Sequence, residues 1–453
     1  MTVEEIKNCS LEELLSFGSF QCSCGKVHHP GVNKVAIGAD ALLKLPDYLE
    51  AIGSKKPFII SGCDTFASAG EKVISVLDAA GISYSKYVFP HSPVRPTEFT
   101  VGSAVMHFDY SCDSIVGIGS GVINDTGKLL ARATCREYIV VATAPSMDGF
   151  VSGTSSMDVD GLKVSLYSKA PWGVIGDLNI LANAPVHLLL SGVGDMLAKI
   201  SSLVEWRLAE IIVGEDYCPV IAALIDKAVS CVFDKADGLL MHDPEAVSAV
   251  MEGLIVAGIA MNYAGVSRPA SGMEHYFSHI WDMRSLAIEG AKFEQHGIQA
   301  GIGTLYTIRA YEKFLEIVKK PDEKKAINYV SNFSNDAWNE QLLKFIGPGA
   351  CAMIEGERRE HKYDPAKHRI RFGIIEKNWN EIVAIIRTLM PSAELEAFMK
   401  KLGMPTDASC IGYDNNQIRT TFMMTKDIRD KYVGTRLFWD LGVLDEVADK
   451  TFL

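Results

Sequence analysis

The alternation of short apolar runs with amphipathic segments, up to about residue 144, most constrains how this chain can fold. The apolar runs are typical of buried strands and occupy residues 57–61, 82–89, 113–119 and 138–144. The segments between them place apolar residues at helical spacing and occupy residues 66–81, 96–108 and 121–133. Short strands separated by helices form a parallel sheet that is covered on both faces. The sequence therefore predicts an α/β domain here.

The second half of the chain has a different pattern. After about residue 183 no further strand is expected, and long apolar-rich segments such as 185–210 and 244–265 predict helices. We expect a domain boundary near residue 182, with an all-α domain over 183–453. At the end of the first domain, residues 162–170 and 172–177 are expected to pair as a hairpin. The charge-rich stretches, 319–325 and 355–371, are interpreted as solvated connections.

Charge excludes some partners. Lys plus Arg total 44 and Asp plus Glu total 56, so the formal net charge is -12. Such a chain repels nucleic acid and anionic membrane surfaces, and an anionic substrate needs a local basic pocket. The apolar stretches are interpreted as too short or too interrupted to span a bilayer. We expect no nucleic-acid partner and no membrane insertion.

The ten cysteines are scattered, and most lie in apolar runs, which is typical of buried thiols. The acidic, amphipathic start of the chain does not resemble a signal peptide. A reducing cytoplasm is the simplest interpretation.

Cys22, Cys24, His28 and His29 gather near the start of the chain. Their spacing is not that of a usual structural zinc site, and a second Cys-x-x-Cys pair is missing. We therefore favour a strand-turn-strand lead-in, with Gly25 and Gly31 at turns.

A glycine-rich turn joins a predicted strand to a predicted helix at residues 116–128. Gly117, Gly119 and Gly121 are expected to let the backbone approach a ligand, and the helix start offers N–H groups to a pyrophosphate. The pattern is G-x-G-x-G, with Val122 where the common dinucleotide fingerprint has its third glycine. A glycine-rich turn without a ligand is an equally good interpretation.

A second turn, at residues 142–156, follows the next strand. The carboxyl ends of adjacent parallel strands meet at the same edge of a sheet, where ligands bind. Thr143, Ser146 and Ser152 would there hydrogen-bond phosphate, ribose or nicotinamide, and Asp148 adds a carboxylate. An ordinary Ser/Thr-rich turn is the alternative.

The helical half carries one carboxylate and three imidazoles of interest. Asp195 lies in an apparent first helical turn, His275 and His279 lie four residues apart on one helix face, and His296 precedes a glycine-rich segment. A borderline divalent metal takes imidazole nitrogen and carboxylate oxygen, so Asp195, His275 and His296 would form a three-ligand site with an open position. Taken singly, each residue is more often structural.

Five segments, GIGSGVIND, APSMDGFVSGTSS, GVGDMLAK, SRPASGMEHYFSHIWDM and HGIQAGIGT, follow one another as in a known family. In them the chain resembles the sn-glycerol-1-phosphate dehydrogenases, above all the bacterial AraM-type branch, and more distantly the glycerol dehydrogenases. The resemblance covers nearly the whole chain. It implies a Rossmann-like, mostly parallel nucleotide-binding domain over 1–182 and a helical metal- and substrate-binding domain over 183–453, as in dehydroquinate synthase-like and iron-alcohol dehydrogenase-like proteins.

The resemblance also implies an activity: metal-dependent interconversion of dihydroxyacetone phosphate and sn-glycerol 1-phosphate with NADH or NADPH, using Zn²⁺ or Ni²⁺, in a homodimer. The implied metal ligands are Asp195, His275 and His296. The implied substrate contacts are Asp148, Asp195 and His279. The implied cofactor contacts follow the two turns: Gly119, Ser120, Gly121, Val122, Ile123, Asn124, Asp125, Thr143, Ala144, Pro145, Ser146 and Ser152.

Some positions are not fixed by the resemblance. Where relatives often carry an acidic residue that reads the ribose, this chain has Gly62, with Asp64 two residues later, so the choice between NAD and NADP stays open. Lys199 replaces a second ligand of iron-type relatives. Lys199 and Arg268 are candidates to bind the substrate phosphate, and structural ion pairs are the alternative.

Asp148 and His279 are candidates for passing a proton to the nascent alkoxide. Three other functions remain open at this stage: a glycerol or other polyol dehydrogenase, a dehydroquinate synthase-like lyase, and a non-catalytic nucleotide-binding protein.

Overall fold

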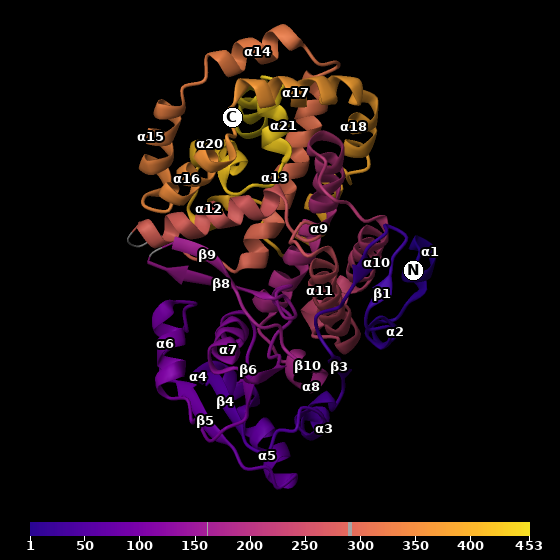
Figure 1. Ribbon diagram of the computed structural model, residues 1–453, viewed down its shortest axis with the longest axis vertical. Coiled ribbons are helices and arrows are strands. Elements are labelled where there is room, and N and C mark those ends of the chain that lie inside the picture. Colours follow the sequence, from indigo (N-terminus) through magenta and orange to yellow (C-terminus); the bar gives the residue numbers. More distant parts are fainter. Residues whose placement is uncertain (161, 289–291) are drawn as a thin grey trace. The chain divides into compact units, whose positions relative to one another are not determined.

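The computed structural model describes residues 1–160, 162–288 and 292–453 and divides into two compact units (Figure 1). The first unit contains Met1–Asp160, Val164–Met196 and Pro219–Ser267. The second contains Leu197–Cys218 and Arg268–Leu453, with a short stretch that ends at Lys163. This division differs from the predicted boundary near residue 182. The reason is that α11 (Pro244–Ala264) packs on β3 (Lys34–Gly38), α8 (Leu178–Leu181) and α10 (Pro219–Lys235), and so joins the sheet's unit.

A six-stranded parallel sheet forms the centre of the first unit. Its strands lie in the order β3, β10, β7, β6, β4, β5. Besides β3, they are β4 (Pro57–Gly62), β5 (Ser85–Phe89), β6 (Ser114–Ile118), β7 (Glu137–Val141) and β10 (Gly173–Asp177). All five pairings are parallel. The predicted α/β class is confirmed.

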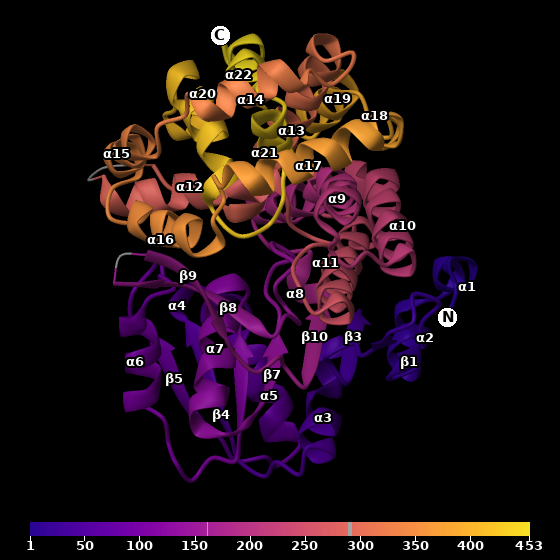
Figure 2. The same ribbon diagram turned by 45° about the horizontal axis from the view of Figure 1, so that its top comes forward.

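Helices cover both faces of this sheet (Figure 2). On one face, α3 (Leu45–Ala51) and α5 (Glu71–Ala79) pack through Leu49 and Leu77 into a core that includes Ile139 and Val141 of β7. Strand side chains alternate, so Tyr138 points to the other face. There it meets α7 (Gly121–Thr134), where a Cβ added at Gly127 would lie 2.5 Å from the Tyr138 ring. Burial on both faces explains why the strands are apolar without alternation.

The predicted hairpin at the end of this region is wrong. Residues of β9 (Leu162–Tyr167) pair with β8 (Thr154–Val159) in a separate two-stranded sheet, whereas β10 enters the main sheet between β3 and β7. The residues of β10 are fully buried, which a sheet centre requires and a surface hairpin does not.

The lead-in contains α1 (Val3–Asn8), α2 (Leu11–Ser16), β1 (Phe20–Gln21) and β2 (Val27–His28). A short helical segment, α4 (Cys63–Thr65) followed by η2 (Phe66–Gly70), comes later, directly after β4. β1 and β2 pair antiparallel, which confirms the strand-turn-strand prediction. Gly31 adopts a φ of +77°, and the Asn262 side chain donates to the Pro30 carbonyl beside it at 2.7 Å. α6 (Glu98–Met106) follows β5 and precedes β6 in the chain.

The second unit is helical in all of its described residues beyond the end of α9 (Val186–Val213), apart from connections. Its helices are α12 (Met273–Ala287), α13 (His296–Ile317), α14 (Glu323–Ser331), α15 (Asn335–Ile346), α16 (Ala350–Glu360), α17 (Pro365–Lys377), α18 (Trp379–Ile386), α19 (Ser392–Lys401), α20 (Asn415–Met424), α21 (Gly434–Asp440) and α22 (Leu444–Phe452). The stretch 355–371, predicted as a solvated connection, lies mostly in α16 and α17. Glu357, His368 and Phe372 are buried there, so the charges mark the outer faces of helices.

Two further expectations need correction. By length and composition, α9 and α11 are apolar enough to cross a membrane, although 78% of each apolar window is buried inside the protein, as in core helices. Among the ten cysteines none forms a disulfide, but only Cys22, Cys112 and Cys218 are buried. Apolar neighbours in the sequence do not bury a thiol on the outer face of an element.

Candidate active site

The candidate cofactor site lies at the carboxyl ends of β4 and β6 in the first unit. From β4 the chain moves outward to β5, and from β6 it moves the opposite way to β7. Strand order therefore reverses between these two adjacent strands, and ligands of open α/β sheets bind at such a point. The glycine-rich turn follows β6 directly. α7 begins at Gly121 with no acidic residue in its first turn, which leaves N–H groups for an anion.

The glycines of this turn serve packing more than ligand approach. A Cβ added at Gly117 would lie 2.3 Å from the Tyr138 hydroxyl, and one added at Gly119 would lie 2.6 Å from Ile123. Only Gly121 has room, since its nearest neighbour, Met147, would be 3.8 Å away. Gly117 and Gly119 are thus required by close contact of β6, β7 and α7; that the turn's backbone also approaches a ligand stays a prediction.

Ser120 joins the two predicted turns. Its hydroxyl donates to the Ala144 carbonyl at 2.6 Å and accepts from the Ala144 N–H at 2.9 Å. The backbone of Thr143, Ala144, Pro145 and Ser146 therefore lies beside the start of α7, as the prediction of a shared site requires.

Several predicted cofactor contacts instead hold the second turn in place. Asn124 donates to the Gly149 carbonyl at 3.1 Å, and Asp125 accepts from the Ser156 N–H at 3.1 Å. Ser152 donates to the Thr154 carbonyl at 3.0 Å. Lys128, which the sequence did not single out, is fully buried and donates to the same carbonyl at 2.6 Å while pairing with Asp125 at 2.8 Å. As contacts to the cofactor itself, Asn124, Asp125 and Ser152 stay predictions.

Asp148 and Asp195 lie together in the first unit. The Asp148 N–H donates to the Asp195 carboxylate at 2.9 Å, and the Ser191 hydroxyl donates to the Ser146 carbonyl at 2.9 Å. α9 approaches this turn closely because Gly192 has no side chain: an added Cβ would lie 2.0 Å from the Pro145 carbonyl oxygen. Asp195 is fully buried.

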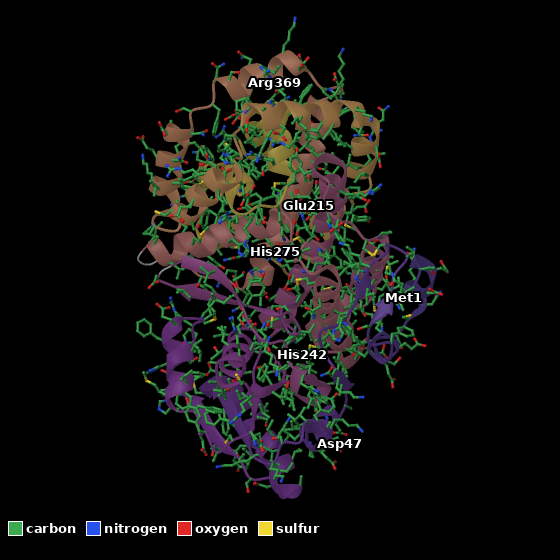
Figure 3. All side chains as sticks on the ribbon, in the orientation of Figure 1. Met1, Asp47, Glu215, His242, His275 and Arg369 are labelled. Atoms are coloured by element: carbon green, nitrogen blue, oxygen red, sulfur yellow. The ribbon has the colours of Figure 1, made fainter. Side chains whose placement is uncertain are left out.

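In the second unit, three histidines gather on α12 and at the start of α13; His275 is marked in Figure 3. The ring centroids of His275 and His296 are 5.1 Å apart, and that of His279 is 6.5 Å from His275 and 6.2 Å from His296. The helical spacing of His275 and His279 was predictable, but the approach of His296 depends on how α13 packs on α12.

The Nδ1 atoms of two of these histidines are already engaged. His275 Nδ1 lies 3.0 Å from Glu274 Oε1, and because a carboxylate only accepts, this nitrogen donates. The Ser278 hydroxyl donates to Gln299 Oε1 at 2.6 Å, so His296 Nδ1, 3.0 Å from the same hydroxyl, donates to it. In neutral rings with these tautomers, both Nε2 atoms carry lone pairs, the arrangement typical of metal-binding histidines.

Two buried carboxyl groups lie behind this cluster. Burial opposes ionisation of Glu274, but the hydrogen bonds from His275, Gly272 and Ser201 outweigh it and hold its pKa below the ordinary value. Burial and the neighbouring Glu274 raise the pKa of Glu205 to about 7. Because its pKa is lowered, the Glu274 carboxylate stays ionised and places a negative charge beside His275.

Cations surround His279. Burial, with Arg429 next in importance, lowers the pKa of His279 well below its ordinary value, so the ring is neutral. Lys431 donates to the Ser271 carbonyl at 2.9 Å, and burial together with Arg268 and Arg429 lowers its pKa to about 7. Sequence reasoning missed Arg429 and Lys431, because nothing in their spacing connects them to α12.

The two predicted phosphate ligands are both buried. Arg268 forms a two-pronged pair with Glu215, with both contacts at 2.5 Å, and donates to the Tyr432 carbonyl at 2.8 Å. This is the structural ion pair kept as the alternative. Lys199 is fully buried on α9. The structure thus brings His275, His279 and His296 together in one unit and Asp148 and Asp195 together in the other; a site shared by all of them stays a prediction.

Proteins of similar sequence point to one family. Residues 36–185 match the family model described as iron-containing alcohol dehydrogenase. A glycerol-1-phosphate dehydrogenase (NAD(P)+) of Bacillus licheniformis is 32% identical over 65% of this chain and 74% of its own length. That of Methanothrix thermoacetophila is 35% identical over 60% of this chain and 75% of its own length.

Solved structures show the same fold. Glycerol dehydrogenase from Schizosaccharomyces pombe superposes with a TM-score of 0.58 at 15% identity, over 96% of this chain and 91% of that one. The iron-containing alcohol dehydrogenase from Corynebacterium glutamicum gives 0.59 at 16% identity, over 93% and 96%. Identity with relatives over most of their length, together with this fold, leads to one conclusion: the chain belongs to the glycerol-1-phosphate dehydrogenase family.

Proposed function

We propose that this protein reduces dihydroxyacetone phosphate to sn-glycerol 1-phosphate with NADH or NADPH at a site that holds one divalent metal ion. The observation that carries the proposal is the pair His275 and His296: their Nδ1 atoms contact Glu274 and Ser278, the kind of contact that orients metal-binding imidazoles, and one ligand atom of each ring lies within 4.8 Å of the other. The activity for which the relatives are named, that of a glycerol-1-phosphate dehydrogenase (NAD(P)+), supports the substrate and cofactor.

Asp195 is the proposed third metal ligand. It lies on α9 two residues before the second unit's part of that helix begins. Farther along the helix, Ser201 donates to Glu274 at 2.7 Å, next to His275 in the sequence. One carboxylate and two imidazoles suit Zn²⁺ or Ni²⁺ and leave a position open for a substrate oxygen.

When bound, a divalent cation stabilises negative charge on the substrate's ketone oxygen by several kcal/mol as a Lewis acid. The reduced nicotinamide supplies the hydride. The chain's residues orient these groups: Glu274 and Ser278 fix the two imidazoles, and the start of α7 with Ser120 receives the cofactor's pyrophosphate.

His279 is the proposed proton relay. Because its ring is neutral, one nitrogen donates a proton while the other accepts one from water. His279 Nδ1 has no hydrogen-bond partner within the part of the chain that the structure describes, which favours a role toward a ligand. Asp148 is the alternative relay and a proposed substrate contact.

For the substrate phosphate we now favour Arg429 and Lys431 over Arg268 and Lys199. Arg429 lies close enough to His279 to lower its pKa, and Lys431 donates to the Ser271 carbonyl just before α12, whereas Arg268 is paired with Glu215. The proposal further includes a homodimer, as the resemblance implies, and a cytoplasmic location, as the cysteines indicate.

The test is oxidation of NADH and NADPH by the metal-loaded protein with dihydroxyacetone phosphate, dihydroxyacetone and, in reverse, glycerol. We expect turnover with the phosphorylated triose and little without the phosphate. Asp195→Ala and His275→Ala should lose both the active-site metal and turnover. A preference for glycerol over its 1-phosphate would reassign the enzyme to the glycerol dehydrogenases, and full activity of a metal-free variant would reject the mechanism.

A further inference from the structure

A second set of metal-binding side chains lies outside the candidate active site; three belong to the lead-in segment, and the fourth directly precedes α10. Its members are Cys22, Cys24, His28 and Cys218. The match to the iron-containing alcohol dehydrogenase model begins at residue 36, after the first three of them. We propose that these four residues hold a structural zinc ion.

The turn between β1 and β2 presents two of the cysteines. The Cys22 N–H donates to the Lys26 carbonyl at 2.9 Å, and the Gly25 N–H donates back to the Cys22 carbonyl at 3.0 Å. Gly25 adopts a φ of +89°, which a residue with a side chain rarely does. This tight turn brings Cys24 back to β2, where its sulfur lies 3.3 Å from His28 Nε2.

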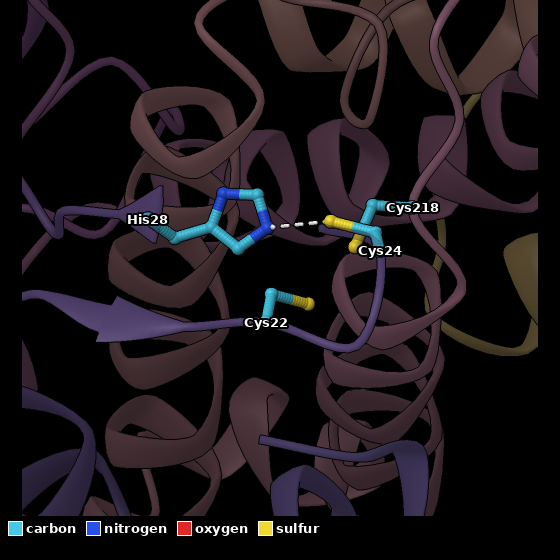
Figure 4. Close-up of side chains that lie close together, drawn as sticks. All are labelled: Cys22, Cys24, His28 and Cys218. Carbon is cyan, nitrogen blue, oxygen red and sulfur yellow. Dashed lines mark hydrogen bonds between the residues drawn. The ribbon is translucent and has the colours of Figure 1, made fainter. Parts of the chain in front are cut away.

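His28 is held in the tautomer that a metal needs. Its Nδ1 lies 2.7 Å from the Tyr263 carbonyl oxygen on α11, and since a carbonyl only accepts, Nδ1 carries the proton. The lone pair is then on Nε2, which faces Cys24 (Figure 4). A backbone carbonyl that fixes the imidazole in this way is a common second contact of zinc-binding histidines.

Cys218 supplies the fourth side chain from a distant part of the sequence. It is the last residue of the segment Leu197–Cys218, and its peptide bond to Pro219 fixes its backbone at the start of α10. Figure 4 shows its sulfur beside that of Cys24. The absence of a second Cys-x-x-Cys pair argued against zinc in the sequence, but the fold provides the missing ligand.

The dimensions suit a tetrahedral ion. One ligand atom from each residue can be chosen so that all four lie within 4.8 Å of one another. With Zn–S of about 2.3 Å and Zn–N of about 2.0 Å, tetrahedral geometry separates sulfur from nitrogen by about 3.5 Å and sulfur from sulfur by about 3.8 Å. The Cys24–His28 distance of 3.3 Å is close to the first value.

The chemistry of the set selects zinc and a structural role. Three thiolates and one imidazole are a usual ligand set of closed structural zinc sites, with no position left for substrate. Each thiol would release its proton to solvent as Zn²⁺ binds. Cys22, His28 and Cys218 are 4%, 2% and 5% exposed, so the ion would be shielded.

The lead-in also needs such a link. Its helices have six residues each and its strands two, so it buries few side chains of its own. A zinc ion would attach β1 and β2 to the start of α10, near Tyr263 of α11, and hold the segment on the rest of the unit.

The test uses the full chain in a His275→Ala, His296→Ala background, where the active-site metal is removed. We expect one tightly bound zinc per chain by elemental analysis, and X-ray absorption of that zinc should show three sulfur neighbours at about 2.3 Å. Adding Cys22→Ser or Cys218→Ser should remove the zinc and increase cleavage of the lead-in by protease. Cys231→Ser, on α10 but outside the set, should change neither.

Because a cysteine variant can fail to fold, the unmutated protein gives a second measurement. Its zinc should show both sulfur-rich and sulfur-free coordination, and a cobalt-substituted form should absorb through sulfur-to-cobalt charge transfer. Zinc without sulfur neighbours, or loss of all zinc on mutation of His275 and His296 alone, would overturn the proposal. So would a disulfide between any two of the three cysteines in freshly purified protein. Each of these outcomes leaves the proposed dehydrogenase activity unaffected.

Discussion

At the scale of single residues, hydrogen-bond partners decide what each histidine can do. His275 and His296 donate through Nδ1 to Glu274 and Ser278, whereas the Nδ1 of His279 is unpartnered within the described residues. These contacts support the proposed metal-binding role of His275 and His296 and the proposed proton relay by His279. The chemistry depends on the neighbours that fix the tautomer more than on the histidines as such.

Replacing Glu274 by Gln tests this orientation. The substitution keeps the size of the side chain but removes the anion against His275, so we expect metal affinity to fall about 10–100-fold. Competition with a chelator measures the affinity, and excess metal should restore turnover. Glu357→Gln, at a buried glutamate on α16, is the matched control. Unchanged affinity in the Glu274 variant would contradict the assigned role.

Glu205 predicts a pH dependence of stability. Its pKa is about 7 in the folded protein and 4.5 in an unperturbed chain, so between these values the folded state holds a proton that the unfolded state has lost. The free energy of unfolding therefore falls as the pH rises from 4.5 through 7. Glu205→Gln cannot titrate, and its stability relative to the parent should rise by about 2–3 kcal/mol between pH 5 and pH 8. If denaturation curves give the same difference in unfolding free energy between the variant and the parent at both pH values, the prediction is refuted.

At the scale of elements, glycines set how closely helices and strands approach one another. Gly192 allows α9 to touch the Pro145 carbonyl, and Gly117 and Gly127 make room for Tyr138 between β6 and α7. These contacts position the two turns of the candidate cofactor site. The glycines appear in the sequence as a ligand-binding pattern, yet most are required by helix-to-sheet packing.

Gly192→Ala should therefore weaken both the fold and cofactor binding. The new Cβ would lie 2.0 Å from the Pro145 carbonyl oxygen and 2.8 Å from Val250, so the turn must move. We expect destabilisation of about 1–3 kcal/mol and a higher Kd for NADPH, measured by thermal unfolding and fluorescence. Gly102→Ala on α6, with no atom within 4 Å of the added Cβ, should be neutral or slightly stabilising. Equal effects at both glycines would argue against the close-contact explanation.

At the scale of the whole molecule, each compact unit carries one part of the proposed chemistry. The first contains the strand-order reversal and the start of α7, and the second contains the histidine cluster. α9 runs through both units without interruption.

Hydrogen exchange can separate the two parts. NADPH should protect the turn after β6 and the turn after β7, because both lie at the proposed pyrophosphate site. Zn²⁺ should protect the first turns of α12 and α13, where His275 and His296 lie. Mass spectrometry of deuterated peptides measures this, and Zn²⁺ added to the His275→Ala variant is the control. Protection by NADPH confined to α12 and α13 would contradict the assignment of the cofactor site.

The sequence by itself determined the parallel α/β class, the helical second half, the positions of most strands and helices, and the family. These follow from local patterns: apolar runs, helical spacing, and short motifs whose order survives in relatives. It also predicted His275 and His279 on one face, because four residues are about one helical turn. Only the pairing of β9 and β10 was wrong in the sheet region, since strand pairing depends on partners distant in the sequence.

The tertiary structure decided what depends on those distant partners. It assigned α10 and α11 to the sheet's unit, paired Arg268 with Glu215, brought Arg429 near His279, and placed Cys218 beside Cys22 and Cys24. None of these follows from spacing, because each joins side chains that only the packing of whole elements brings within a few ångströms of one another.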